Sequence, residues 1–147
     1  MHADLPRFTG SVEHALDDKG RLIVPARFRE RLGAGFVITL ALPDPCLALY
    51  PSVTWSAFCA NLEEAPRKDE RFRRLVRHLF ANTEEVACDA QGRLLIPSAL
   101  RTYAGIEHNV RSLGALTRVE IWAAERYANN GAPDGEVAEF MADLGLY

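Results

Sequence analysis

The chain has 147 residues, 48% hydrophobic and 25% charged, a composition typical of a soluble globular domain rather than a fibrous or disordered protein. Its formal net charge of −3 gives none of the overall basic excess that marks many nucleic-acid-binding proteins. The charge is uneven, however, because residues 1–80 hold 12 Lys and Arg against 10 Asp and Glu, whereas residues 81–147 hold 5 against 10.

Cysteine content and hydropathy exclude several further classes of protein. Cys46, Cys59 and Cys88 are too few and too widely spaced for a disulfide framework or a zinc site. The first residues lack the apolar core of a signal peptide, and no stretch of about 18 apolar residues could span a bilayer. We therefore expect a cytoplasmic protein without a metal, a cofactor or a membrane partner.

An internal repeat at an offset of 72 residues is the strongest feature of the sequence. Residues 13–33 and 85–105 are identical at nine of 21 positions. The identical pairs are Glu13/Glu85, Ala15/Ala87, Asp17/Asp89, Gly20/Gly92, Arg21/Arg93, Leu22/Leu94, Pro25/Pro97, Arg29/Arg101 and Gly33/Gly105. The same offset continues without a gap into residues 47–55 over 119–127. This pattern predicts a tandem duplication with a pseudo-two-fold arrangement.

The elements of the first copy follow from turn and breaker residues. Residues 8–16 and 22–24 are predicted to form a β-hairpin around a turn at Gly20. Pro25 is then expected to begin a short helix that ends at Gly33. In this helix the apolar side chains face the core and the charged ones, Arg27, Arg29, Glu30 and Arg31, are left largely to solvent. Strands are predicted over 36–40 and 46–50.

The connector and the second copy complete the predicted order. Helices are predicted over 51–62 and 66–80, and the second has a core-facing stripe at helical spacing, namely Phe72, Leu75, Val76, Leu79 and Phe80. Copy two repeats the pattern with strands over 108–113 and 118–122, followed by a helix over 123–129 and a short acidic helix over 136–144. The predicted organisation is a first repeat at 8–55, a helical connector at 56–80, a second repeat at 81–127 and an acidic C-terminal tail at 128–147. Because a copy of about 50 residues is too small to bury much apolar surface, the two copies are expected to fold into each other.

Each predicted turn carries the motif Asp-x-x-x-Arg. The first contains Asp17, Lys19 and Arg21, and the second Asp89, Gln91 and Arg93. The glycine lets the backbone approach a surface closely, and the arginine offers a fork of donors suited to phosphate or to the O6/N7 edge of guanine. The aspartate can hold that arginine in one rotamer and so reduce the entropy lost on binding. The same pair could also serve only to bridge the turn, and both interpretations stay open on these residues.

Two other parts of the sequence offer alternatives to these turns as a functional site. The helix at 67–80 contains a cluster of cationic residues, Arg67, Lys68, Arg71, Arg73, Arg74 and Arg77. A solvated face or a subunit contact is favoured over DNA binding there, because no helix-turn-helix pattern precedes it.

No catalytic motif is present, the four histidines share no metal-ligand spacing, and Cys88 is expected to be a small buried group rather than a nucleophile. No enzymatic activity is therefore predicted.

The sequence resembles the MraZ family. The resemblance rests on LDDKGRLIVPARFRERLG, on DAQGRLLIP 72 residues later, and on CLALYP and VEIW at matching spacing, and it covers residues 8–127. It implies an α+β fold made of a tandem duplicated AbrB-like swapped-hairpin β-barrel with short helices. It also implies a transcriptional regulator, usually a repressor, that binds direct repeats in the promoter of the bacterial division and cell wall gene cluster as a ring of many subunits on the nucleoid.

The family's DNA-contacting motif falls on Asp17, Lys19 and Arg21 in copy one and on Asp89 and Arg93 in copy two. Gln91 departs from the pattern because Lys19 is its counterpart, so the second turn is less basic. Thr9 stands where the family commonly has an arginine. The alternative function is that of a non-enzymatic assembly or interaction protein whose Asp-x-x-x-Arg turns are structural.

Overall fold

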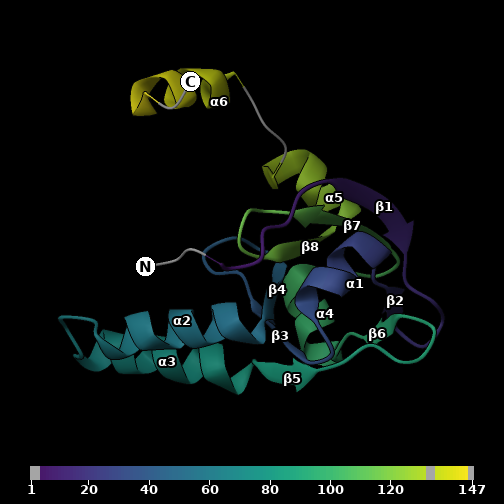
Figure 1. The fold of residues 1–147 in the computed structure, drawn as a ribbon, viewed down its shortest axis with the longest axis horizontal. Helices are drawn as coiled ribbons and strands as arrows, with labels where there is room; N and C mark the ends of the chain where they lie inside the picture. The colour runs from purple at the N-terminus through teal and green to yellow at the C-terminus, as the bar shows by residue number, and fades with distance from the viewer. Residues whose placement is uncertain (1–3, 132–134, 146–147) are drawn as a thin grey trace.

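A computed structural model describes residues 4–131 and 135–145 and has an α+β fold (Figure 1). The strands are β1 (Ser11–Ala15), β2 (Arg21–Ile23), β3 (Phe36–Leu40), β4 (Leu47–Pro51), β5 (Glu84–Val86), β6 (Arg93–Leu95), β7 (Asn109–Gly114) and β8 (Val119–Ala123). The helices are α1 (Ala26–Leu32), α2 (Ser52–Glu63), α3 (Glu70–Ala81), α4 (Ser98–Ala104), α5 (Ala124–Arg126), the π-helical η1 (Tyr127–Gly131) and α6 (Glu136–Leu144). Each copy therefore contributes two strands, a short helix and two more strands, as the repeat predicts.

The two copies exchange strands. The large antiparallel sheet has the order β1-β7-β8-β4-β3-β5, so β1 of the first copy pairs with β7 of the second, and β5 of the second pairs with β3 of the first. The predicted hairpin between residues 8–16 and 22–24 is therefore wrong as a pairing, because β2 leaves β1 after the turn and pairs with β6. Pairing across copies lets each small unit share one apolar core with the other.

The short β2–β6 ribbon is symmetric about one pair of leucines. Leu22 lies opposite Leu94, its equivalent 72 residues later, and both side chains are buried. On the two sides of this pair, the Val24 amide donates to the Gly92 carbonyl at 3.0 Å and the Ile96 amide donates to the Gly20 carbonyl at 3.1 Å. The pseudo-two-fold axis that relates the two copies therefore passes through this ribbon.

The large sheet is open. Among the residues that the structure describes, it runs from β1 at one edge to β5 at the other without closing, so the predicted barrel is present only as an open sheet. The sheet stays open for two reasons. Strands β2 and β6 pair with each other in a separate ribbon and do not join the large sheet, and the edge strand β5 is only three residues long. The main core combines both copies and packs large side chains, including Phe8, Phe28, Phe36, Ile96 and Leu100.

Helices α2 and α3 project from the sheet at one end of the molecule (Figure 1). The predicted core stripe of α3 is largely wrong, because only Leu79 is buried and the side chains of Leu75 and Phe80 are 40% and 36% exposed. The helix has a strongly apolar face, and the described residues opposite it cover that face only in part. No helix in the described ranges is long and apolar enough to cross a membrane.

Candidate nucleic-acid interface

The first Asp-x-x-x-Arg turn is held together by one carboxylate. Asp17 Oδ1 accepts hydrogen bonds from the backbone amides of Lys19 and Arg21, each at 2.9 Å, and Oδ2 accepts from Arg21 Nε at 2.7 Å. The Asp17 amide donates to the Arg21 carbonyl at 2.9 Å, and Gly20 takes a φ of 78° to complete the turn. The terminal guanidinium nitrogens of Arg21 make no hydrogen bond within the described part of the chain, and the side chain is 27% exposed.

The second turn repeats this geometry with one addition. Asp89 Oδ1 accepts from the amides of Gln91 and Arg93, each at 2.9 Å, and Oδ2 accepts from Arg93 Nε at 2.8 Å. Gly92 has the same φ of 78°. The side-chain oxygen of Gln91 also accepts from Arg93 Nη2 at 3.1 Å, so one more donor of this arginine is occupied. Arg93 therefore has fewer donors left for an external ligand than Arg21.

Both turn aspartates are held in the charged form. The backbone amide of Arg21 donates to Asp17 and, with the guanidinium of the same residue, lowers the pKa of that carboxyl below its ordinary value. The backbone amide of Arg93 lowers the pKa of Asp89 in the same way. At neutral pH each turn therefore keeps an ionised aspartate that fixes the direction of its arginine.

Two helix arginines support the turns across the repeats. Arg101 on α4 packs against the turn of the first copy, because a Cβ placed on Gly20 would lie 2.9 Å from its Cζ. Arg29 on α1 packs against the second turn in the same way, because a Cβ placed on Gly92 would lie 2.9 Å from the Cζ of Arg29. Arg29 also donates to the Val24 carbonyl at 2.8 Å and Arg101 to the Ile96 carbonyl at 3.2 Å.

The expectation that Arg29 is left to solvent is therefore wrong, since its side chain is half-buried. Because the two copies interlock, α1 of the first copy lies against the turn of the second copy. The apolar periodicity of α1 alone does not reveal this contact. The identity of Arg29 and Arg101 in the repeat was the signal that could have indicated a shared role.

The ribbon presents both arginines on one face. Side chains alternate along a strand, so Arg21 and Ile23 of β2 lie on the face opposite the buried leucine pair, together with Arg93 and Leu95 of β6. Arg21 is paired with Leu95, and Ile23 with Arg93. The side chains of Ile23 and Leu95 are 59% and 58% exposed, which is unusual for large aliphatic groups in strands. These two aliphatic residues of the candidate site were not predicted from the sequence, because a three-residue strand does not reveal which of its sides is buried.

Comparison with known proteins assigns the chain to a family. Residues 7–78 and 79–133 each match the family described as "MraZ protein, putative antitoxin-like". This chain belongs to the MraZ family. Three relatives carry the name transcriptional regulator MraZ: the protein of Lachnoclostridium phytofermentans is 40% identical over 140 residues, that of Acetivibrio thermocellus 42% over 143 and that of Clostridium beijerinckii 44% over 142. The alignments cover 95% of this chain and 98% or 99% of each relative.

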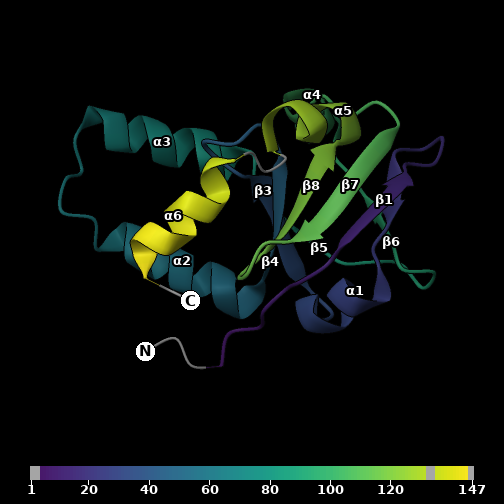
Figure 2. The same cartoon turned by 90° about the horizontal axis from the view of Figure 1, so that it is seen from above.

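In this MraZ-family chain the cationic residues of α3 lie far from the turns. Figure 1 places β2 and β6 at the end of the molecule opposite to α2 and α3, and Figure 2 places β6 there as well. Asp69 caps α3 by accepting from the Phe72 amide at 3.1 Å, and it also pairs with Arg67 at 3.1 Å and Arg71 at 3.7 Å. The two cationic surfaces of the chain are thus separate.

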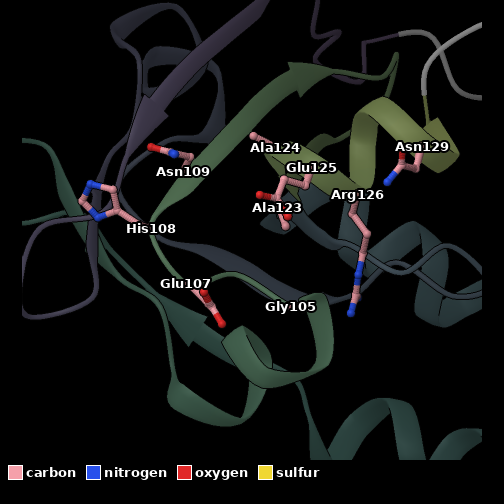
Figure 3. A pocket seen from close by; sticks show the side chains of 9 residues that line it. All are labelled: Gly105, Glu107, His108, Asn109, Ala123, Ala124, Glu125, Arg126 and Asn129. Carbon is pink, nitrogen blue, oxygen red and sulfur yellow. The ribbon is translucent and has the colours of Figure 1, made fainter.

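A polar cavity of about 410 Å³ lies elsewhere on this MraZ-family chain, between the start of β7 and α5 (Figure 3). Its lining includes Glu107, His108 and Arg126 but none of the turn residues. Arg126 is engaged in the fold, because it donates to the Tyr103 carbonyl at 2.8 Å. Over the ranges that the structure describes, no three His, Cys, Asp or Glu side chains are grouped as metal ligands.

The thiols give no support to an activated nucleophile. Burial raises the pKa of Cys88, and the same cause raises the pKa values of Cys46 and Cys59. Cys88 is partly buried against the main core, close to its predicted environment.

Proposed function

We propose that this chain is a sequence-specific transcriptional regulator that binds double-stranded DNA through its two Asp-x-x-x-Arg turns. The observation that carries the proposal is the pair of equivalent turns, which direct Arg21 and Arg93 onto one face of a two-stranded ribbon. The names of the relatives, transcriptional regulator MraZ, support the same function.

The chemistry of the ribbon suits the major groove of DNA. That groove admits a two-stranded β-ribbon, and an arginine whose Nε is already fixed keeps its terminal nitrogens for guanine or phosphate. Lys19 adds a phosphate contact in the first turn. Each turn has nearly balanced charge, because an aspartate accompanies each arginine, so a single contact is weak and sensitive to salt.

Assembly would convert these weak contacts into useful affinity. We propose a homo-oligomeric ring whose subunits engage successive direct repeats at high effective concentration. The fold is proposed to be of the AbrB-like swapped-hairpin class, which is supported by the exchange of β1 and β5 between copies. The target would be the promoter of the division and cell wall gene cluster, with repression as the outcome, in the cytoplasm on the nucleoid and without enzymatic activity or cofactor.

The test is binding to fluorescent duplexes that carry one or several direct repeats from the chain's own promoter region, at several salt concentrations. We expect Arg21→Ala and Arg93→Ala each to weaken binding about tenfold or more, and the double variant to abolish specific binding. Arg111→Ala is the matched control, because the Arg111 side chain is 29% exposed, against 27% for Arg21 and 29% for Arg93, and it pairs with a carboxylate, Glu13, at 2.8 Å on the large sheet.

A second candidate function is that of an assembly protein whose turns are purely structural. It is favoured by one observation, that each turn arginine already satisfies its Nε within the turn, at 2.7 and 2.8 Å. If the double variant binds the multi-repeat duplex as tightly as the wild type does, the DNA proposal is wrong and this alternative takes its place.

A further inference from the structure

Helix α6 carries an apolar stripe that no other described part of the chain covers. Val137, Phe140, Met141 and Leu144 follow each other at spacings of three, one and three residues and so lie along one side of α6. Their side chains are 45–61% exposed. No residue of α6 is buried, and Figure 1 shows the helix standing away from the rest of the fold. A nine-residue helix is marginal in water without packing, so this stripe requires a partner surface.

A second incomplete apolar surface lies between α2 and α3. A groove of about 350 Å³ is lined by apolar side chains from both helices, together with Glu63 and Lys68. The apolar residues are Cys59, Leu62, Phe72, Val76 and Phe80. An open apolar groove between two helices is the type of surface that binds an amphipathic helix by its apolar face.

The charged edges of these two surfaces are complementary. Arg73 and Arg77 are four residues apart, and each directly follows a groove residue, so they form one edge beside the groove. On α6, Asp143 directly precedes Leu144 and lies beside the apolar stripe, whereas Glu139 lies further round the helix on its polar side. An acidic residue therefore borders the apolar stripe of α6, and a basic edge accompanies the apolar lining of α3.

We propose that α6 of one copy binds in the α2–α3 groove of a second copy. Its apolar stripe fills the groove, and Asp143 faces the edge formed by Arg73 and Arg77. The occupant is a second copy because the described residues of this chain leave both surfaces open at once. In Figure 2 α6 overlaps α2 in projection, but Figure 1 shows the two helices well separated.

This contact is head-to-tail, since each copy offers one α6 and one groove. Such heterologous contacts close into a ring when the rotation between copies allows it. The acidic tail and the cationic helix would thus serve assembly, and the contact would form with or without DNA.

A natural thiol in the groove allows a direct test. Cys59 lines the groove, so Phe140→Cys places a second thiol opposite it only if α6 docks there. The full chain is oxidised by air with a copper catalyst at alkaline pH, because burial raises the pKa of the Cys59 thiol, and is then run on a non-reducing gel. We expect covalent dimers and higher multimers that disappear on reduction and in the variant that also carries Cys59→Ala.

The matched control is Ala142→Cys, which places the thiol on the opposite side of α6 and should give little cross-linking. Equal cross-linking of the two variants would overturn the proposal. So would a Phe140→Cys protein that runs as a monomer with both thiols consumed, because α6 would then occupy the groove of its own chain.

A charge exchange gives a second readout by sedimentation equilibrium. Arg73→Glu with Arg77→Glu is expected to weaken self-association roughly tenfold, and adding Asp143→Arg is expected to restore part of it. Failure of Asp143→Arg to restore any association would contradict the docking. None of these residues lies in the turns, so binding to a single-repeat duplex should be unchanged, and failure here would leave the DNA proposal intact.

Discussion

At the scale of single residues, each turn holds its arginine rigidly and still leaves it able to donate. The aspartate occupies Nε and two backbone amides and leaves the terminal nitrogens of Arg21 for an external acceptor. In the second turn Gln91 occupies part of this capacity through its 2.8–3.1 Å network with Asp89 and Arg93. The two turns are thus equivalent in backbone geometry but unequal in the donors they present.

Because the two turns present unequal numbers of donors, exchanging Lys19 and Gln91 between them should change the affinity for DNA. Gln91→Lys should strengthen DNA binding about threefold to tenfold at low salt and make its salt dependence steeper, because it adds one phosphate-binding cation and releases Arg93 Nη2. Lys19→Gln should have the opposite effect. Fluorescence anisotropy over a salt series measures both, and a Gln91→Lys protein with unchanged salt slope would contradict the prediction.

The turn aspartates also predict how stability depends on pH. Their pKa values are lowered in the folded state from an ordinary value of 3.8, so their contribution is fully present above that pH. It is lost as the pH falls below 3.8 through the folded-state pKa, when protonation removes the acceptors of the turn. The double variant Asp17→Asn, Asp89→Asn should therefore be less stable than the wild type at pH 7, and the difference should shrink towards pH 3.

Urea unfolding at pH 7, 5 and 3 measures this difference. Asp18→Asn is the control, because Asp18 is an exposed neighbour that accepts none of these turn hydrogen bonds. A constant difference between the double variant and the wild type across this range would show that the ionised carboxylates do not stabilise the turns.

At the scale of elements, helices α1 and α4 act as supports for turns that belong to the opposite copy. Arg29→Ala should remove the hydrogen bond to the Val24 carbonyl and the packing against Gly92, and should lower the free energy of unfolding by about 1 to 3 kcal/mol. Arg31→Ala on the same helix is the matched control and should have little effect, since Arg31 is exposed. Thermal and urea unfolding measure both variants, and equal stability of the two would contradict a supporting role.

Local sequence patterns were sufficient to predict the turns and helices but not to predict which strands pair with each other. Turn residues, prolines and periodicity correctly predicted the turns at Gly20 and Gly92 and the helices of the connector, because these depend on neighbours in the chain. The pairing of β1 with β7 could not be predicted, because an alternating strand fits any partner of suitable register. The exposure of Ile23 could not be predicted either, because a three-residue strand does not reveal which of its sides is buried.

At the scale of the whole molecule, the exchange of strands makes the two copies one folding unit. Without the second copy, β1 would lack β7, β3 would lack β5 and β2 would lack β6. Leu22 and Leu94, each about 1% exposed, would also lose each other across the ribbon. A single copy would thus present several unpaired strand edges and an opened core, which a unit of this size cannot offset.

This architecture predicts that the halves 1–82 and 83–147 are each unfolded alone and fold when combined. The cut falls between α3 and β5, so it interrupts no helix or strand. Circular dichroism should show little cooperative unfolding for either half, whereas a co-expressed pair should purify together and unfold in one transition at a temperature below that of the intact chain, because association now costs translational entropy. The co-expressed pair is also the control for damage by the cut itself. Cooperative unfolding of fragment 1–82 by itself would mean that the first copy is an independent domain, and strand exchange would then be a mode of association rather than a requirement of the fold.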